Sequence, residues 1–270
     1  MPLVDSFLVR AGRVVAPAAH RDRMRESAHT LWGAEQSPQA IDDAVAALYE
    51  QAAHALGGEA GLFFPKLTLD YANDHFSYDF DPRPIAKSRL ETTAHLIAHP
   101  GRDERAHPRL KGPDFAWQER VRAWALEHGA SDALLRAAEP KGRNSSTRQL
   151  HYSETAFGSV ALWSNGVLVT SSEADRLPSI TERMIVQIAR ERGHETLAAP
   201  LTKQRLREAD AVWLLSSLHG VREATVGLTD LPAPHIASTY APPRGPFAPA
   251  ARDFQAALWE RAEPIGELAA

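Results

Sequence analysis

One stretch of the sequence, residues 110–135, constrains the fold most, because it combines an amphipathic helix with a buried strand. Gly112-Pro113-Asp114 supplies helix start signals, since proline fits the first turn and aspartate accepts hydrogen bonds from unpaired N–H groups. Gly129 suits a left-handed residue after the helix end, and residues 133–135 (Ala-Leu-Leu) suit a core strand. Apolar residues recur at helical spacing between these points, at Trp117, Val121, Trp124 and Ala125.

Lys111 stands at the start of this predicted helix. The helix dipole opposes a positive charge there and favours the neutral amine, which is the form that attacks a carbonyl group. A surface helix can carry a lysine at the same place, so the position alone does not decide its role. Lysines are few in this chain: Lys66, Lys87, Lys111, Lys141 and Lys203.

The composition excludes several classes of protein. The chain has 270 residues, of which 44% are apolar, enough for one large or two modest domains. The net charge of −4 argues against a nucleic-acid partner, and the absence of cysteine excludes disulfides and thiolate chemistry. No apolar run approaches the about 20 residues of a membrane span, and no secretion signal begins the chain. We therefore expect a cytoplasmic protein without a membrane partner.

The first part of the chain is predicted to be a mixed α+β domain with mostly antiparallel strands. A hairpin is expected over residues 7–15, helices over 20–32 and 37–56, and strands over 62–71, 76–81 and 90–99. Residues 100–108 are charged and lack any period, which favours a linker. The predicted domains are therefore residues 1–108, with the linker at about 100–108, and residues 109–270.

The second domain is predicted to be α/β, because strands and helices alternate along it. Asn165-Gly166 is a strong turn signal between strands expected over 159–164 and 167–172. Helices are expected over 181–192, 202–210 and 252–261, and a strand over 211–215. A polar loop is expected over 141–146, and the proline-rich residues 231–250 favour no regular element.

The motifs of several enzyme classes are absent. The sequence has no GxGxxG after a strand, no GxxxxGK[ST], no GxSxG and no HExxH. His95 and His99 form the tightest histidine pair, and surface or core histidines explain that pair better than a metal site does. We therefore expect no metal.

Four places remain as candidates for chemistry. They are Lys111, Glu154 before a predicted strand, the turn Leu177–Thr181 that begins a helix, and the loop Ser216–Gly220 after a core strand. The free N–H groups of a helix start bind phosphate, and a loop after a core strand often contacts ligands. Each place also has an ordinary structural explanation, as a helix cap, a strand lead-in or a loop.

Their order along the chain resembles the class IV aminotransferases. Lys111 is followed by GASDALL, Glu154, LPSITER and LREADAVWLLSS, and the start, DSFLVRAGRVVAPAAHRDRMRESA, is similar more faintly. The resemblance implies a fold-type-IV pyridoxal phosphate enzyme, with a smaller N-terminal domain, a larger α/β domain and the cofactor in the cleft between them. It also implies a homodimer, because family members build part of the substrate pocket from the partner subunit.

The resemblance assigns a role to each matching residue. Lys111 matches the lysine that forms a Schiff base with pyridoxal 5'-phosphate, and Glu154 matches the carboxylate at the pyridine nitrogen. Arg23 matches the arginine at the phosphate. The same group is contacted by positions matching Ile180, Thr181, Ser217 and Leu218. The chain has Asp114-Phe115 where the family often has Asn-Tyr, and Ser179 and Glu182 where it has glycine and a basic residue.

The substrate carboxylate needs a cationic or N–H-rich site. Arg83, between Pro82 and Pro84, is the first candidate, although a rigid surface turn explains it equally well, and His219 is a second candidate. We predict a transaminase acting on an amino acid and a 2-oxo acid. The alternatives are an aminodeoxychorismate lyase, which releases pyruvate and 4-aminobenzoate, and a non-catalytic binding protein.

Overall fold

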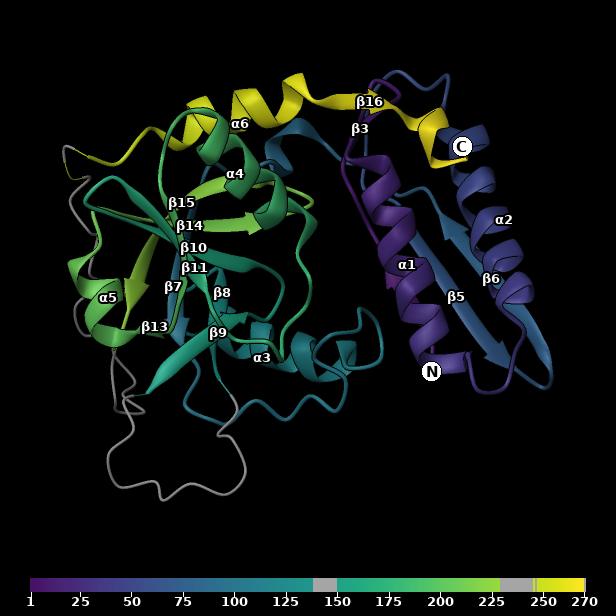
Figure 1. Ribbon diagram of the computed structural model, residues 1–270, viewed down its shortest axis with the longest axis horizontal. Helices are drawn as coiled ribbons and strands as arrows, with labels where there is room; N and C mark the ends of the chain where they lie inside the picture. Colours follow the sequence, from purple (N-terminus) through teal and green to yellow (C-terminus); the bar gives the residue numbers. More distant parts are fainter. Residues whose placement is uncertain (138–149, 229–244, 246, 270) are drawn as a thin grey trace. The chain divides into compact units, whose positions relative to one another are not determined.

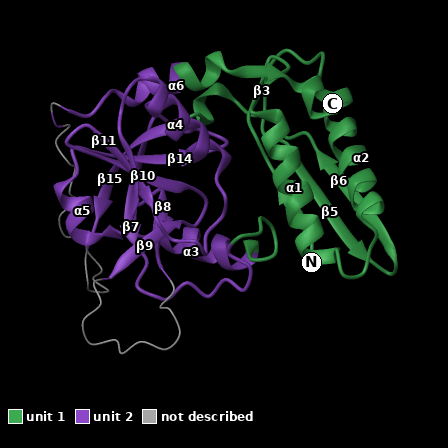
Figure 2. Ribbon diagram, in the orientation of Figure 1, with its two compact units in different colours: residues 1–90, 109–115, 257–270 green, residues 91–108, 116–256 purple. Residues whose placement is uncertain are grey.

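The structure is a computed structural model that describes residues 1–137, 150–228, 245 and 247–269 (Figure 1). It divides into two compact units (Figure 2). Unit 1 comprises residues 1–90, 109–115 and 257–270, and unit 2 comprises residues 91–108 and 116–256. The predicted loop over 141–146 and most of the proline-rich segment over 231–250 lie outside the described residues.

Unit 1 contains two sheets whose strand pairs are antiparallel, in agreement with the mostly antiparallel strands predicted for residues 1–108. The strand predicted over 90–99 instead lies in unit 2, where it pairs in parallel with both neighbours. The three-stranded sheet has the order β1 (Leu3–Asp5), β5 (Lys66–Ala72), β6 (His75–Asp81). The four-stranded sheet has the order β16 (Ala262–Pro264), β3 (Arg13–Val15), β2 (Val9–Arg10), β4 (Leu62–Phe63). The expected strand over 62–71 is therefore two strands, β4 and β5, which belong to different sheets.

Two helices pack against these strands. They are α1 (Pro17–Trp32) and α2 (Pro38–Leu56), and α2 contacts β5 and β6 (Figure 1). The predicted cap at Ser37 is confirmed, because its side chain accepts a hydrogen bond from the N–H of Ala40 at 3.2 Å. The apolar stripe of α2 enters the core of unit 1, where Ile41, Leu48 and Ala52 are fully buried. Two 3-10 turns, η1 (Lys87–Arg89) and η3 (Ile265–Leu268), complete the unit.

Unit 2 is built on a nine-stranded mixed sheet. Its strand order is β12 (Thr196–Ala199), β11 (Val167–Ser171), β10 (Ser159–Ser164), β14 (Ala211–Ser216), β15 (Gly220–Gly227), β7 (Thr93–Ala98), β8 (Asp132–Arg136), β9 (His151–Thr155) and β13 (Leu201–Thr202). Three neighbouring pairs are parallel: β7 with β8, β7 with β15, and β11 with β12. The sheet curls, so that β9 also contacts β10 and β11.

The helices of the second part of the chain lie close to their predicted positions. They are α3 (Phe115–Glu127), α4 (Ile180–Glu191), α5 (Lys203–Glu208) and α6 (Ala251–Glu260). In α3, Val121 and Ala125 are buried, and Gly129 adopts the expected left-handed conformation with φ of 74°. Within the described residues, no helix is both long enough and apolar enough to cross a membrane.

The chain passes between the two units more than once. Residues 91–108, which include the expected linker, group with unit 2, whereas residues 109–115, which carry Lys111, group with unit 1. The expected division into residues 1–108 and 109–270 stays a prediction, because grouping by contacts does not define units that fold independently.

Gly112 fixes the backbone beside Lys111. Its φ is 128°, and an added Cβ would overlap the carbonyl oxygen of Pro2 and lie 2.9 Å from the backbone nitrogen of Val4. The N–H of Val4 in turn donates to the carbonyl of Lys111 at 2.8 Å. Only glycine therefore allows this segment to lie against β1.

We expect Gly112→Ala to destabilise unit 1 by more than the about 1–2 kcal/mol of left-handed strain alone, because backbone atoms must also move. Gly166→Ala is the matched control, since Gly166 has φ of 81° and open space around an added Cβ. Thermal unfolding followed by circular dichroism measures both. Equal losses in melting temperature would contradict the close approach to β1.

Candidate active site

A buried carboxylate, Asp5 at the end of β1, lies at the centre of the polar contacts of unit 1. Its side chain is 2% exposed. Its Oδ2 accepts hydrogen bonds from the Tyr49 hydroxyl at 2.9 Å and from His20 Nδ1 at 2.8 Å. Burial is the largest cause that lowers the pKa of His20, and the contact with Asp5 opposes it. These contacts connect β1 to both helices of the unit.

The other oxygen of Asp5 faces two cations. Its Oδ1 accepts from Arg23 Nη2 at 2.6 Å and lies 3.4 Å from Lys111 Nζ. Burial alone would raise the pKa of Asp5, but His20, Arg23 and Lys111 outweigh it and hold that pKa well below 3.8. Asp5 is therefore ionised at neutral pH and holds Arg23 and Lys111 beside each other.

Lys111 is a buried amine, with 17% of its side chain exposed. Burial is the largest cause that lowers its pKa to about 8, and the charges of Arg23 and Arg83 act in the same direction, whereas Asp5 opposes them. The shift is in the direction expected from the sequence, toward the neutral amine, and about a tenth of the amine is neutral at pH 7. Burial, rather than the helix dipole, is its main physical cause.

Arg83 belongs to the same cluster. Its Nη2 donates to the Ser6 hydroxyl at 3.1 Å, and the backbone carbonyl of Ser6 lies 3.4 Å from Lys111 Nζ. Arg83 has an unusual φ of 38°, and 38% of its side chain is exposed. Its buried Nε lies 4.0 Å from Asp81 Oδ2 and has no hydrogen bond to any residue that the structure describes. The structure thus brings the predicted residues Arg23, Arg83 and Lys111 together in unit 1. We call these residues, with Asp5, Ser6, His20 and Tyr49, the Lys111 cluster.

Two cavities lie among the described residues, and neither combines the volume of a cofactor with a lining of predicted site residues. The first, beside Asp5, Arg23 and Lys111, has a volume of about 10 Å³, which is room for about one water molecule. The second, in unit 2, has a volume of about 450 Å³ and is lined by residues such as Ser164 and Arg205. It contains none of the predicted site residues.

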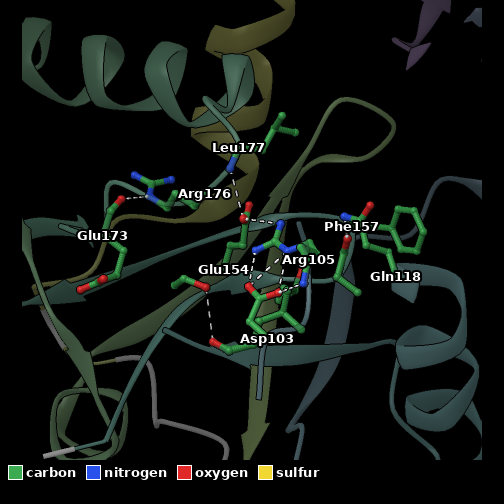
Figure 3. Close-up of polar contacts among 12 residues, drawn as sticks. Asp103, Arg105, Gln118, Glu154, Phe157, Glu173, Arg176 and Leu177 are labelled. Atoms are coloured by element: carbon green, nitrogen blue, oxygen red, sulfur yellow. Dashed lines mark hydrogen bonds and ion pairs between the residues drawn. The ribbon is translucent and has the colours of Figure 1, made fainter. Parts of the chain in front are cut away.

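The carboxylate of Glu154 lies on β9 in unit 2 and is 5% exposed (Figure 3). Its Oε1 pairs with Arg105 Nη1 at 2.8 Å and accepts from the N–H of Leu177 at 3.1 Å. Burial raises the pKa of Glu154 to about 7, and these two partners together with Arg176 only partly oppose that rise. Glu154 is therefore balanced between its neutral and ionised forms near pH 7.

Arg105 is held in place by Asp103. Its Nε lies 2.9 Å from Asp103 Oδ1, and its Nη2 lies 2.6 Å from Oδ2, so the two side chains form a forked pair (Figure 3). Only 2% of the Arg105 side chain and 8% of the Asp103 side chain are exposed. Asp103, Arg105, Glu154, Arg176 and Leu177 are called the Glu154 cluster below.

The predicted phosphate-binding turn leads from the Glu154 cluster into α4. Ser179 caps α4 by accepting from the N–H of Glu182 at 3.2 Å. The first N–H groups of the helix, those of Ile180 and Thr181, have no acceptor inside it and remain suited to an anion. The acidic residue noted in the sequence, Glu182, is neutralised by Arg176, at 2.6 and 2.9 Å.

The remaining predicted residues, Ser217, Leu218 and His219, form the turn between β14 and β15. All three are partly buried, and Nδ1 of His219 accepts from the N–H of Glu91 at 3.2 Å. The turn belongs to unit 2, as do Glu154, Ile180 and Thr181. The predicted site residues thus form two groups, one in each unit.

Seven residues of these clusters were not predicted from the sequence: Asp5, Ser6, His20, Tyr49, Asp103, Arg105 and Arg176. A signal for Asp5 is present, because an acidic residue between the apolar pairs Leu3-Val4 and Phe7-Leu8 is rarely solvated. Asp103 and Arg105 carry no such signal, since charged residues in a segment without a period suggest an exposed linker.

The chain matches the profile described as "Amino-transferase class IV" over residues 3–226. The chain belongs to the class IV aminotransferase family. The resemblance predicted from the motifs is thereby confirmed. Enzymes of this family use pyridoxal 5'-phosphate. The comparison with curated protein sequences found no match.

Solved structures share the fold of the family. A branched-chain amino acid aminotransferase of Escherichia coli is 16% identical, with TM-score 0.70, covering 96% of this chain and 84% of that one. A protein described as a 4-amino-4-deoxychorismate lyase, from Legionella pneumophila, is 22% identical, with TM-score 0.63, covering 85% and 83%. A hypothetical aminotransferase of Mycobacterium tuberculosis, in a PLP-bound form, is 16% identical, with TM-score 0.69, covering 96% and 88%. The mixed fold-type-IV architecture predicted from the sequence is confirmed.

We expect Asp5→Ala to lower the stability of unit 1 by about 3–5 kcal/mol, because it leaves Arg23 and Lys111 buried without their counter-ion. The pKa of Asp5 in the folded protein lies well below the ordinary value of 3.8. The stabilisation is therefore fully present at neutral pH and decreases progressively as the pH falls from 3.8 toward the pKa of the folded protein. Urea unfolding at pH 7 and pH 3 measures it.

Asp22→Ala is the control, since Asp22 forms an exposed pair with Arg25 on the same helix. A pair of that kind contributes about 0–1 kcal/mol. If both substitutions shift the unfolding midpoint equally, the central role of Asp5 is wrong.

Proposed function

We propose that this protein is a pyridoxal-phosphate-dependent transaminase, which moves an amino group from an amino acid to a 2-oxo acid. The observation that carries the proposal is Lys111, a buried amine with a pKa of about 8 among guanidinium groups. Membership of the class IV family supports the same cofactor.

The described residues fit the cofactor in chemical type. Lys111 offers an amine, Arg23 a guanidinium for a phosphate, and Ile180 and Thr181 offer N–H groups at a helix start. Glu154 offers a buried carboxylate for a ring nitrogen. Arg23 Nη2 donates to Asp5, and the planar guanidinium of Arg23 is a group of the type that binds phosphate.

The proposed roles follow from these properties. When bound, pyridoxal phosphate supplies an aldehyde that reacts with amines and a ring that accepts the electrons released at Cα. Lys111 would hold the cofactor and, once released, would take the proton from the substrate Cα as a base and deliver it as an acid to the aldehyde carbon of the cofactor. Asp5 keeps the Lys111 amine in place, and Glu154 would accept a hydrogen bond from the ring nitrogen. Ser217 and Leu218 are proposed near the phosphate.

The decisive experiment compares two reactions of the purified protein. Amino transfer from a panel of amino acids to 2-oxoglutarate is expected, measured by chromatography of the products. Pyruvate release from aminodeoxychorismate, without amino transfer, would replace the transaminase by the lyase. Absence of both reactions, with no bound pyridoxal phosphate, would favour a non-catalytic binding protein.

Lys111 is expected to carry the cofactor covalently after borohydride reduction. Mass spectrometry of the digested protein should find the label on Lys111, and Lys111→Ala should lose both label and turnover. Lys203→Ala is the control, because Lys203 lies on α5 of unit 2. Label retained in Lys111→Ala would overturn the assignment.

The attachment rate should also report the pKa of Lys111. With a pKa of about 8, about a tenth of the amine is neutral at pH 7 and about nine tenths at pH 9, so the rate should rise about tenfold and then level. An amine of pKa 10.5 would give a rise of about a hundredfold over the same range without levelling. Stopped-flow absorbance separates the two profiles.

Arg83 is proposed to bind the substrate carboxylate, because its guanidinium is partly exposed beside Ser6 in the Lys111 cluster. Arg83→Lys keeps the charge but loses the fork, so the KM for the amino donor should rise by about tenfold or more while kcat changes less. An unchanged KM would exclude Arg83. The role of His219 in substrate binding stays a prediction.

The family resemblance also leads us to propose a homodimer. Size-exclusion chromatography with light scattering measures the mass directly. A mass near 29.6 kDa at micromolar concentration would exclude it.

A further inference from the structure

The two oxygens of Glu154 have different surroundings, and this difference has a chemical meaning if the protein binds pyridoxal phosphate as proposed above. Oε1 is contacted by both Arg105 Nη1 and the N–H of Leu177. Across the described part of the chain, no hydrogen bond is formed by Oε2. The carboxylate is therefore fixed through one oxygen, while the other can accept a proton donor.

Arg105 is a rigid partner for Glu154. Asp103 binds both its Nε and its Nη2, and also accepts from the backbone N–H of Arg105 at 3.1 Å. The remaining nitrogen, Nη1, is the one that contacts Glu154 (Figure 3). A guanidinium held in this way cannot turn away from Glu154 without breaking the forked pair.

The other charged groups around Glu154 are occupied elsewhere. Arg176 pairs with Glu182 at 2.6 Å, and Glu173 pairs with His151 at 2.8 Å. Arg105 is thus the cation in direct contact with the carboxylate, among the residues that the structure describes. Burial favours the neutral acid, and the contact with Arg105 favours the ionised form.

We propose that Arg105 is a positioning residue that favours the ionised form of Glu154 and leaves its Oε2 directed to the ring nitrogen of bound pyridoxal phosphate. Arg105 touches Oε1, so its charge is closer to the carboxylate than to a nitrogen bonded at Oε2. Its field therefore favours the proton on the nitrogen rather than on the oxygen. Arg105 in this way keeps the ring cationic without contacting it.

The test uses Arg105→Met, which removes the charge at similar length, and Arg105→Lys, which retains the charge. In the protein without cofactor, carbon-13 NMR of labelled glutamate gives the titration of Glu154, assigned with Glu154→Gln. We expect the titration midpoint to rise by about 1 to 3 pH units in Arg105→Met and by less in Arg105→Lys.

The loaded protein supplies a second measurement. With pyridoxal phosphate labelled with nitrogen-15 in its ring, the chemical shift at pH 7.5 distinguishes a protonated from an unprotonated nitrogen. We expect the protonated value in the wild type, and a move toward the unprotonated value in Arg105→Met. Arg222→Met is the matched control, because Arg222 is a buried arginine of the same unit that pairs with Glu91 at 2.9 Å.

Each outcome decides something different. A wild-type protein that takes up no cofactor contradicts the proposed function. Cofactor uptake with an unchanged Glu154 midpoint and an unchanged nitrogen shift in Arg105→Met overturns the role of Arg105 alone. If Arg105→Met does not fold, Asp103→Asn releases the arginine instead. The same shifts, reduced in size, are then expected, and unshifted signals would contradict the proposal.

Discussion

The Asp5 carboxylate is the interaction on which unit 1 depends most. It accepts from α1 through His20 and Arg23, from α2 through Tyr49, and faces Lys111 in the segment 109–115. A buried anion is stable only where such partners surround it, and each partner is costly to bury without the anion. The elements that bring these side chains together therefore depend on one another through one carboxyl group.

The second buried carboxylate, Glu154, obeys the same physics with the opposite result. Asp5 has three nearby ionisable partners and a tyrosine hydroxyl, which together hold its pKa well below the ordinary value. Glu154 has one cation in contact and one backbone N–H, and burial prevails, so its pKa rises to about 7. The number of direct partners decides whether burial or the neighbouring charges and donors set the direction of the pKa shift. A strongly ionised Asp5 suits a permanent structural anion, and a balanced Glu154 suits a group that exchanges a hydrogen bond with a ligand.

Periodicity and helix caps predicted most elements of the fold, because apolar spacing and capping residues act over a few neighbouring positions. The stripe of α2, the Ser37 cap and the Asn165-Gly166 hairpin follow from such local rules. The grouping of residues 91–108 with unit 2 does not, since it depends on contacts between residues far apart in the chain.

The site residues divide in the same way. Lys111, Arg23 and Glu154 were predicted because their motifs resemble a family. Asp5 and Arg105 were not, since each acts through a partner 18 or more residues away: Arg23 for Asp5 and Glu154 for Arg105. Spacing along the chain carries no information on such pairs. The lowered pKa of Lys111 was predicted in direction, but its main cause, burial, becomes visible only in three dimensions.

The division of the chain into segments also bears on the order in which it can fold during synthesis. Unit 2 draws on residues 91–108 and 116–256, whereas unit 1 also requires residues 257–270, which supply β16 and the core residues Ile265 and Leu268. The ribosome synthesises the chain from its N-terminus, so the four-stranded sheet of unit 1 can form completely only after residues 257–270 have been synthesised. Residues 1–90 are synthesised before unit 2, but the sheet that they form is completed after it. Until β16 is synthesised, the edge of β3 with which it pairs has no partner strand.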